Sequence, residues 1–476
     1  MPTVVIAGAG VAGLASALAL HGTGHRVLLL ERGDAPPEAP GQERPTVPQA
    51  VHSHTLTSLG VRVLRDRAPR VLDALLDAGA RLLDLTAALP AAATDSGPEP
   101  GDRELVALGC RRSVLELVLY RAVRALPRVS VRHRSTVERL ELDERSRVRA
   151  VLTSTGERLA ADLVVDATGR RAAHRAWLTE ARITTPEDRT APSGLTGYTR
   201  FYRLLGEAPP GPPNRGNAAG GIWDHYAGVL HPADAGTFSV ALATLPGDHE
   251  LAGLRTEAGF TAAAVATPEL DRWLAPGVSV PISPVHAITV PPNALRSVAL
   301  SSPVDGLYPV GDAACITNPL FGRGMSLALA HAFRLADLLA ARPGPGATSA
   351  AGAADPLTAA AGRLVAEVYL PWYEQSAAAD QARIDRWRAA RDGVVPPAPS
   401  GTGLGPAEIA AAAATDGRVW RGLTRMLMTL ATPAEVLGDE KFLARVRQAS
   451  PGEAPQQPPT RAELVHLVGA ATEAVL

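Results

Sequence analysis

Three glycines near the start of the chain have the spacing of a phosphate-binding turn. Gly8, Gly10 and Gly13 form a GxGxxG pattern directly after the apolar run Val4–Ala7 and before a helix expected over residues 14–20. The first glycine permits a tight turn, the second lets the backbone approach a pyrophosphate, and the third lets the helix pack closely on the strand. The amino end of this helix would face the phosphate charge. The pattern predicts a dinucleotide-binding site.

An acidic residue at the end of the next expected strand narrows the choice of dinucleotide. The apolar run Arg26–Leu30 is followed by Glu31 and Arg32. A carboxylate at this position can accept hydrogen bonds from both hydroxyls of an adenosine ribose, and it disfavours a 2′-phosphate. The dinucleotide is therefore expected to be FAD or NAD and not NADP.

Two later segments also lead from an apolar strand into a turn of small residues. They are Asp162–Gly169 and Leu307–Ala314, and the second precedes a glycine-rich turn, Asn318–Ser326, that opens a long expected helix. Backbone N–H groups and the dipole at the amino end of a helix stabilise negative charge. The chain thus contains two turns that are suited to an anionic or electron-rich group.

In this order the motifs resemble those of the para-hydroxybenzoate hydroxylase-like family, the single-component (group A) FAD-dependent monooxygenases, over residues 3–340. In that family the aspartate at the strand end, here Asp312, lies against the flavin ribityl chain. The following turn, here Pro319–Met325, opens a helix that faces the pyrimidine edge of the flavin, where it stabilises the anionic reduced ring. The resemblance implies that the dinucleotide is FAD.

One further stretch, Arg44 with Val47–His54, resembles a branch of this family that includes bacterial polyether epoxidases and other polyketide-tailoring flavoenzymes. In the family an arginine at this place reaches the cofactor diphosphate. Two histidines of the stretch, His52 and His54, have no third ligand at a sensible spacing, so no metal is predicted. Loop packing and a place beside the flavin both stay open for them.

A second arginine of the family pattern falls just before an expected helix. Arg112 matches the family arginine that meets the cofactor, and a capping box at Ser113–Glu116 is expected to begin the helix that ends at Ala125. An exposed, solvated arginine is the alternative. The residues that these matches assign to the cofactor are Gly8, Gly10, Ala12, Gly13, Glu31, Arg32, Arg44, Gln49, Arg112, Asp166, Gly169, Gly311, Asp312, Pro319, Gly322, Gly324 and Met325.

The resemblance also implies a reaction. FAD would be bound non-covalently, NADPH or NADH would visit as a transient reductant, and O2 would form the flavin C4a-hydroperoxide that hydroxylates or epoxidises the substrate. Such chemistry needs few acid or base side chains, so no catalytic residue is assigned. Aromatic hydroxylases of the family have Asn after the methionine of the turn, where this chain has Ser326. This favours a sizeable apolar, polyketide-like substrate of secondary metabolism, with a redox-neutral cyclase of the cycloaddition type as the alternative.

The elements that must position these residues predict an α/β fold with three parts. A Rossmann-like FAD-binding domain spans residues 1–192 and 293–345, an inserted β-sheet substrate domain spans 193–292, and a helical C-terminal region spans 346–476. Strands are expected near 198–204, 220–230 and 237–245. Several aromatic residues of this sheet are core residues or, for about a third of them, walls of a substrate cavity: Tyr198, Phe201, Tyr202, Trp223, Tyr226 and Phe238.

Composition limits the partners. The 476 residues have a net charge of -1, which gives no indication of a nucleic-acid or anionic-membrane partner. The two cysteines are too few for a disulfide framework, which favours a reducing cytoplasmic location, and no leader segment is expected. The apolar stretch Met325–Leu339 is interrupted by His331, Arg334 and Asp337 and should not span a membrane. The expected partners are a small apolar substrate and O2, and the chain is expected to be a monomer or homodimer.

Overall fold

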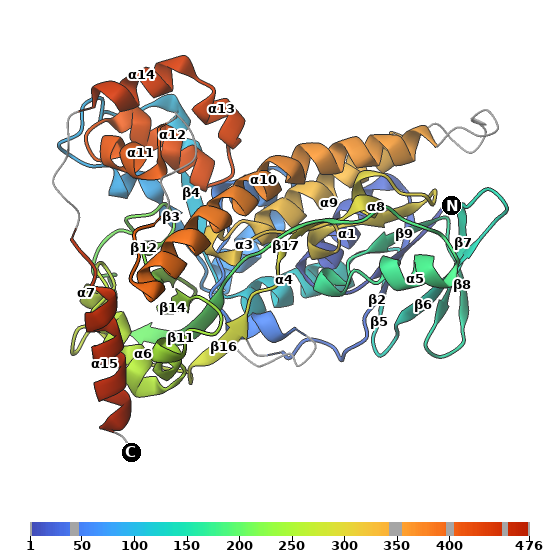
Figure 1. The fold of residues 1–476 in the computed structure, drawn as a ribbon. Helices are drawn as coiled ribbons and strands as arrows, with labels where there is room; N and C mark the ends of the chain where they lie inside the picture. The colour runs from blue at the N-terminus through green and yellow to red at the C-terminus, as the bar shows by residue number, and fades with distance from the viewer. Residues whose placement is uncertain (1, 39–46, 342–354, 397–403, 450–455, 475–476) are drawn as a thin grey trace.

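A five-stranded parallel sheet takes four strands from the first 166 residues and one strand from residues 307–309 (Figure 1). The computed structural model describes residues 2–38, 47–341, 355–396, 404–449 and 456–474. The strand order in this sheet is β18 (Leu307–Pro309), β9 (Leu163–Asp166), β1 (Thr3–Ala7), β2 (Arg26–Leu30) and β5 (Val129–Arg132). The central strands β1 and β9 are almost fully buried because apolar side chains point to both faces of the sheet.

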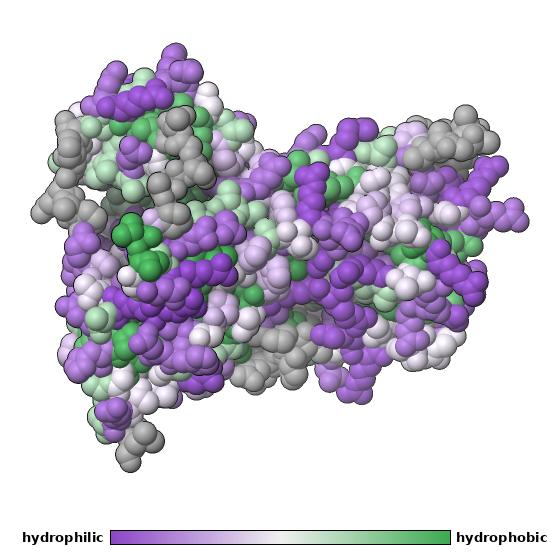
Figure 2. All heavy atoms as spheres, in the orientation of Figure 1, coloured by the Kyte–Doolittle hydropathy of each residue, from purple (hydrophilic) through white to green (hydrophobic). Residues whose placement is uncertain are grey.

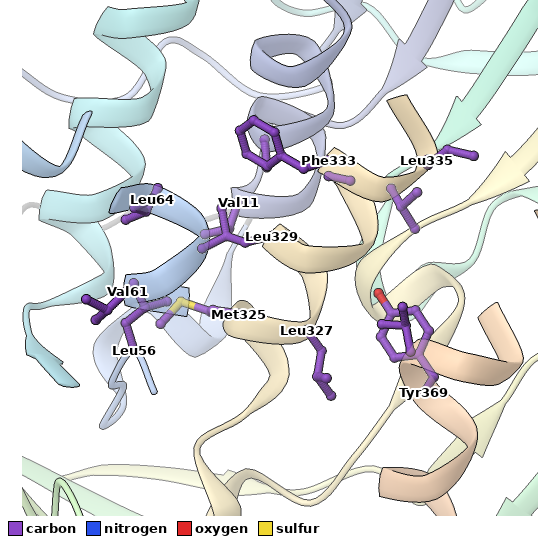
Figure 3. Packing of buried hydrophobic residues seen from close by; sticks show 14 of the residues in the cluster. Val11, Leu56, Val61, Leu64, Met325, Leu327, Leu329, Phe333, Leu335 and Tyr369 are labelled. Atoms are coloured by element: carbon purple, nitrogen blue, oxygen red, sulfur yellow. The ribbon is translucent and has the colours of Figure 1, made fainter. Parts of the chain in front are cut away.

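Helices cover one face of this sheet. α1 (Val11–Leu20) packs against α9 (Gly324–Ala340) and α4 (Arg112–Arg124), while α9 also contacts α2 (Ser58–Arg67). Figure 3 shows Leu329 of α9 beside Val11 of α1, and Met325 of α9 near Val61 of α2 and Leu56. This packing fixes where the first turns of α1 and α9 lie relative to each other.

A small antiparallel sheet covers the other face. It consists of β6 (Val137–Leu142), β7 (Val148–Thr153) and β8 (Arg158–Ala160), and α5 (His174–Glu180) packs beside it. Val5 of β1 and Val164 of β9 share a buried cluster with Val151 and Trp177 of this layer. The central sheet is therefore buried between two layers.

The second large sheet is antiparallel. Its order is β12 (Ala219–Ile222), β13 (Ala227–Pro232), β14 (Thr237–Thr244), β11 (Thr196–Leu204) and β15 (Ser279–Pro281), with β16 (His286–Thr289) also pairing with β11. The single strand expected over 220–230 is wrong, because Trp223 turns the chain and the segment forms the hairpin β12–β13. α6 (Glu257–Val265) and α7 (Asp271–Leu274) lie on one face of this sheet.

Smaller elements join the two large sheets. The sheet of β10 (Arg189–Ala191), β17 (Asn293–Leu295) and β19 (Cys315–Ile316) lies where the chain enters and leaves the antiparallel sheet. Other elements before the C-terminal helices are the pair β3 (Arg81–Asp84) and β4 (Val106–Gly109), and the helices α3 (Pro69–Asp77) and α8 (Ser297–Leu300).

The C-terminal helices distribute over three parts of the molecule (Figure 1). α10 (Pro356–Asp392) lies along α9 and α8, whereas α15 (Arg461–Glu473) packs on α6 of the antiparallel sheet. Between them, one group packs together near β3 and β4: α11 (Pro406–Ala413), α12 (Gly417–Leu427), α13 (Pro433–Leu437) and α14 (Glu440–Gln448). Hydrophilic residues predominate on the face shown in Figure 2.

The expected α/β class, with a Rossmann-like core, additional antiparallel sheets and a helical C-terminal region, is confirmed. A capping box begins α15, where the Thr460 hydroxyl accepts from the Glu463 N–H. The capping box expected at Ser113 is wrong as the start of this helix, because α4 begins at Arg112 and its N-cap is Arg111. No helix in the described ranges is both long and apolar enough to cross a membrane.

Candidate cofactor and active site

A cavity of about 330 Å³ lies at the carboxyl ends of the parallel strands β1, β2, β9 and β18. In open parallel sheets this edge is where ligands bind, because the strand ends and the following turns meet there. Most of the walls come from the turns after these four strands and from the first turns of α1 and α9, and Gln49 and Arg112 add to them. The cavity thus joins all the motifs that sequence spacing singled out.

The three glycines of the first motif have different surroundings. A Cβ atom on Gly13 would lie 1.8 Å from the Gly8 carbonyl oxygen, so Gly13 permits the close packing of α1 on β1. Gly8 has a φ of +103° and a Cβ there would lie 2.5 Å from the Ala167 carbonyl oxygen. A Cβ on Gly10 would meet only Arg112 Nη2, at 3.9 Å, and Gly10 lines the cavity. Space for a pyrophosphate against the backbone therefore exists at Gly10.

Glu31 lies at the end of β2 on the wall of the cavity. Its side chain is buried, and its two carboxylate oxygens accept from the N–H groups of Ala9 and Gly33, each at 2.8 Å. These bonds fix the carboxylate between the first turn and the end of β2. A carboxylate oxygen can accept more than one hydrogen bond, so the position suits the hydroxyls of an adenosine ribose.

Positively charged side chains line the cavity from two sides. Arg112 Nε donates to the buried Glu116 carboxylate at 2.9 Å, which places the guanidinium over Gly10. Arg170 lies across the cavity with its Nε 3.9 Å from Asp312 Oδ2, and burial lowers the pKa of Arg170. Sequence reasoning missed Arg170, although two arginines directly follow Gly169. Both guanidinium groups can compensate the negative charge of a diphosphate.

The amino end of α9 is open toward the cavity. Gly324 is the first residue of the helix, a Cβ there would meet nothing within 4 Å, and the first turn contains no acidic residue. Behind this end, the buried Arg323 guanidinium lies over the rings of Phe321 and Trp372, and burial lowers its pKa to about 9. At neutral pH the charge of Arg323 adds to the positive potential of the helix end.

The cavity walls include most of the cofactor residues expected from the sequence. They are Gly8, Gly10, Ala12, Glu31, Arg32, Gln49, Arg112, Gly169, Gly311, Asp312, Gly324 and Met325. Gly13 lies behind the wall, Pro319 and Gly322 belong to the turn before α9 without lining the cavity, and Arg44 lies outside the described residues.

Asp166 also lies behind the cavity wall. It is fully buried at the end of β9 and accepts from His174 Nδ1 at 2.7 Å and from the Thr168 hydroxyl at 2.6 Å. Its carboxylate therefore holds the turn that carries Gly169, and does not itself reach the cavity.

The two histidines of the His-x-His pair point to different neighbours. His54 donates from Nδ1 to the His52 carbonyl oxygen, and its Nε2 lies 3.5 Å from Arg112 Nη1. Burial and the Arg112 charge lower the pKa of His54 to about 3. His52 Nδ1 lies 3.1 Å from the Thr199 hydroxyl on β11. Among the described residues no group of three or more metal-ligating side chains occurs.

Successive residues of β11 point to opposite faces of the antiparallel sheet. Tyr198 and Tyr202 point into a buried cluster with Tyr226 and Phe238, which α6, α7 and α15 close. The rings of Tyr202 and Phe238 are stacked, with their centroids 5.3 Å apart. These four aromatic side chains are core residues, so they are not walls of a substrate cavity beside the cofactor.

The opposite face of the sheet meets the cofactor-binding half. Thr199, which contacts His52, is on this face, and Phe201 lies two residues further along it. Leu320, from the turn before α9, packs against a cluster on the same face that includes Ala227 and Ala243.

Comparisons with known proteins agree with this geometry. Residues 1–196 match the FAD binding domain family. The chain is 31% identical to Protein Rv3254 of Mycobacterium tuberculosis over 366 aligned residues. The alignment covers 71% of this chain and 73% of that protein.

Two solved structures have the same fold. A variant of PqsL from Pseudomonas aeruginosa has a TM-score of 0.60 at 18% identity, covering 83% of this chain and 100% of that one. OxyS anhydrotetracycline hydroxylase from Streptomyces rimosus has a TM-score of 0.56 at 17% identity, covering 90% of this chain and 76% of that one.

Proposed function

The chain belongs to the para-hydroxybenzoate hydroxylase-like family of FAD-dependent flavoprotein monooxygenases, and on that premise we propose that it hydroxylates or epoxidises a sizeable, largely apolar small molecule. NADPH or NADH would reduce the non-covalently bound FAD. The product would belong to secondary metabolism, with a polyketide-like skeleton.

The observation that carries this proposal is the open amino end of α9. The helix begins at Gly324 on the cavity wall, its first turn contains no acidic residue, and the buried Arg323 adds a positive charge behind it. Such an environment stabilises negative charge on a bound ring system. A site that needed FAD only as a structural group would gain nothing from this arrangement.

Bound FAD would supply the hydride acceptor and the oxygen chemistry. The residues of the chain would then have three tasks. Gly10 and Arg112 would hold the diphosphate, and Asp312 would accept hydrogen bonds from the ribityl chain. The face of the sheet around Thr199 would position the substrate and exclude water.

Anaerobic mixing of the purified holoprotein with NADPH, and separately with NADH, tests this proposal. We expect the flavin absorbance to bleach with one or both nucleotides and to return when O2 is admitted. Flavin that stays oxidised with both nucleotides would contradict the proposal and would support a redox-neutral cyclase instead.

A further inference from the structure

Two basic side chains at the inner face of the antiparallel sheet have buried nitrogen atoms without hydrogen-bond partners. Arg215 lies in the turn before β12, and His231 lies on β13. Arg215 Nη1 and His231 Nδ1 are inaccessible to solvent, and no described residue forms a hydrogen bond with either atom. Most buried polar groups in proteins have a partner, so each exception calls for an explanation.

Several other buried guanidinium groups in the described chain contact a carboxylate, whereas that of Arg323 donates to the Gln375 side-chain oxygen and lies over two aromatic rings. Four of them contact a carboxylate at 2.5 to 3.1 Å, namely those of Arg200, Arg296, Arg383 and Arg421. Asp234 is the acid nearest to His231 in the sequence, and it is held by Arg111 at 2.6 Å. The positive charge of Arg215 is therefore left without a counter-charge from the described residues.

The two side chains lie close enough to influence each other. Burial, and after it the charge of Arg215, lowers the pKa of His231 to about 4. The imidazole is thus neutral at neutral pH, and it can donate a hydrogen bond without adding a second positive charge. The guanidinium of Arg215 and the neutral imidazole of His231 can therefore both donate hydrogen bonds to one oxygen-bearing group.

Their position is the boundary between the sheet and the turn that opens α9. His231 pairs across the sheet with Ser239, which pairs with Phe201, so His231 is on the face that contacts His52. Asn217, two residues after Arg215, donates to the Thr55 hydroxyl, and a Cβ on Gly322 would lie 2.8 Å from the Thr55 methyl group.

We propose that Arg215 and His231 bind an anionic oxygen group of the substrate, either a carboxylate or an ionised enol or phenol. This inference rests on the proposed function and narrows its substrate class to an apolar molecule with one acidic end. The guanidinium matches the planar, two-oxygen geometry of a carboxylate and keeps its charge when buried. Binding the acidic end at this boundary would direct the rest of the molecule toward the Pro319–Met325 turn before α9.

Calorimetric titration of the oxidised holoprotein with three aromatic probes tests this site. The probes are 2-naphthoate, its neutral isostere 2-naphthamide, and pentafluorophenol, which is ionised at neutral pH. We expect at least one anion to bind about tenfold or more tightly than the amide, because hydrogen bonds to charged groups are the stronger ones. The anion with the higher affinity identifies the acidic group that the site prefers.

Variants separate a binding role from a structural one. Arg215→Gln should weaken binding of the preferred anion by about tenfold to a hundredfold and leave amide binding unchanged. Its melting temperature should equal or exceed that of the wild type, because an uncompensated buried charge is removed. Arg203→Gln is the matched control, since Arg203 is an exposed arginine on β11 of the same sheet, and it should bind the anion as the wild type does.

Equal affinity for anion and amide, the absence of anion binding, or unchanged anion affinity in Arg215→Gln would each overturn the inference. The titrations need neither nucleotide nor O2. Their failure would therefore leave flavin reduction, the test of the proposed function, unaffected, and the converse also holds.

Discussion

Two glycines three residues apart should respond oppositely to the same substitution. A methyl group on Gly13 would lie 1.8 Å from the Gly8 carbonyl oxygen and 3.2 Å from the Ala167 Cβ, so α1 would have to move away from β1. Overpacking of this kind costs about 1 to 3 kcal/mol. The same methyl group on Gly10 meets only the end of the Arg112 side chain at 3.9 Å, and the φ of −82° suits alanine.

Gly13→Ala should therefore lower the free energy of unfolding of the FAD-free protein by about 1 to 3 kcal/mol, whereas Gly10→Ala should change it by less than about 0.5 kcal/mol. In Gly10→Ala the methyl group occupies space that the pyrophosphate needs. A steric cost of about 1 to 3 kcal/mol weakens FAD binding roughly five- to 150-fold.

Urea unfolding of the FAD-free proteins and fluorescence titration with FAD measure the two effects. Gly22→Ala is the control, because a Cβ at that position meets nothing within 4 Å and Gly22 does not line the cavity. An unchanged FAD affinity in Gly10→Ala, or equal losses of stability in both variants, would refute this account of the turn.

Three further outcomes are expected. Asp312→Ala should lose FAD affinity about tenfold to a hundredfold by equilibrium dialysis while its unfolding curve is retained. Gly324→Pro should keep the fold, since proline suits the first position of a helix, but the loss of one N–H at the cavity should slow flavin reduction in stopped-flow mixing. The free energy of unfolding should fall as the pH falls from 6.5, because His54 and His331 have a pKa of about 3 in the folded protein and bind protons at higher pH when unfolded. Each histidine should lower the free energy of unfolding by about 1.4 kcal/mol per pH unit between these two pKa values. Urea titrations at several pH values should show that the free energy of unfolding of His331→Leu falls less per pH unit than that of the wild type.

Much of the cofactor cavity could be predicted from the sequence because its parts are local. The strand, the glycine turn and the helix of residues 3–20 are contiguous, and Glu31 and Asp312 each follow a strand of the same parallel sheet. Once the strands are parallel and adjacent, their carboxyl ends meet by topology alone. The positions of these residues then follow without knowledge of any side-chain contact.

Other features depended on tertiary packing. Alternation along β11 predicts that Tyr198 and Tyr202 share one face of the sheet. It does not predict whether that face packs against the Pro319–Met325 turn or, as in the structure, against α6 and α15. Asp166 and Asp312 both lie where a strand of the parallel sheet passes into a turn of small residues. The Asp166 carboxylate nevertheless accepts from His174 Nδ1 at 2.7 Å and does not line the cavity. Arg215 gave no signal, because a lack of partners is visible only in three dimensions.

The central claim is that the reaction uses both electrons from a nicotinamide cofactor and an atom of O2. The most direct test is conversion, under isotopically heavy O2, of a compound that accelerates NADPH or NADH oxidation by the holoprotein. The account predicts that product forms only when nucleotide and O2 are both present and that it contains one heavy oxygen atom. Product that forms at an undiminished rate without O2 and without nucleotide would contradict it.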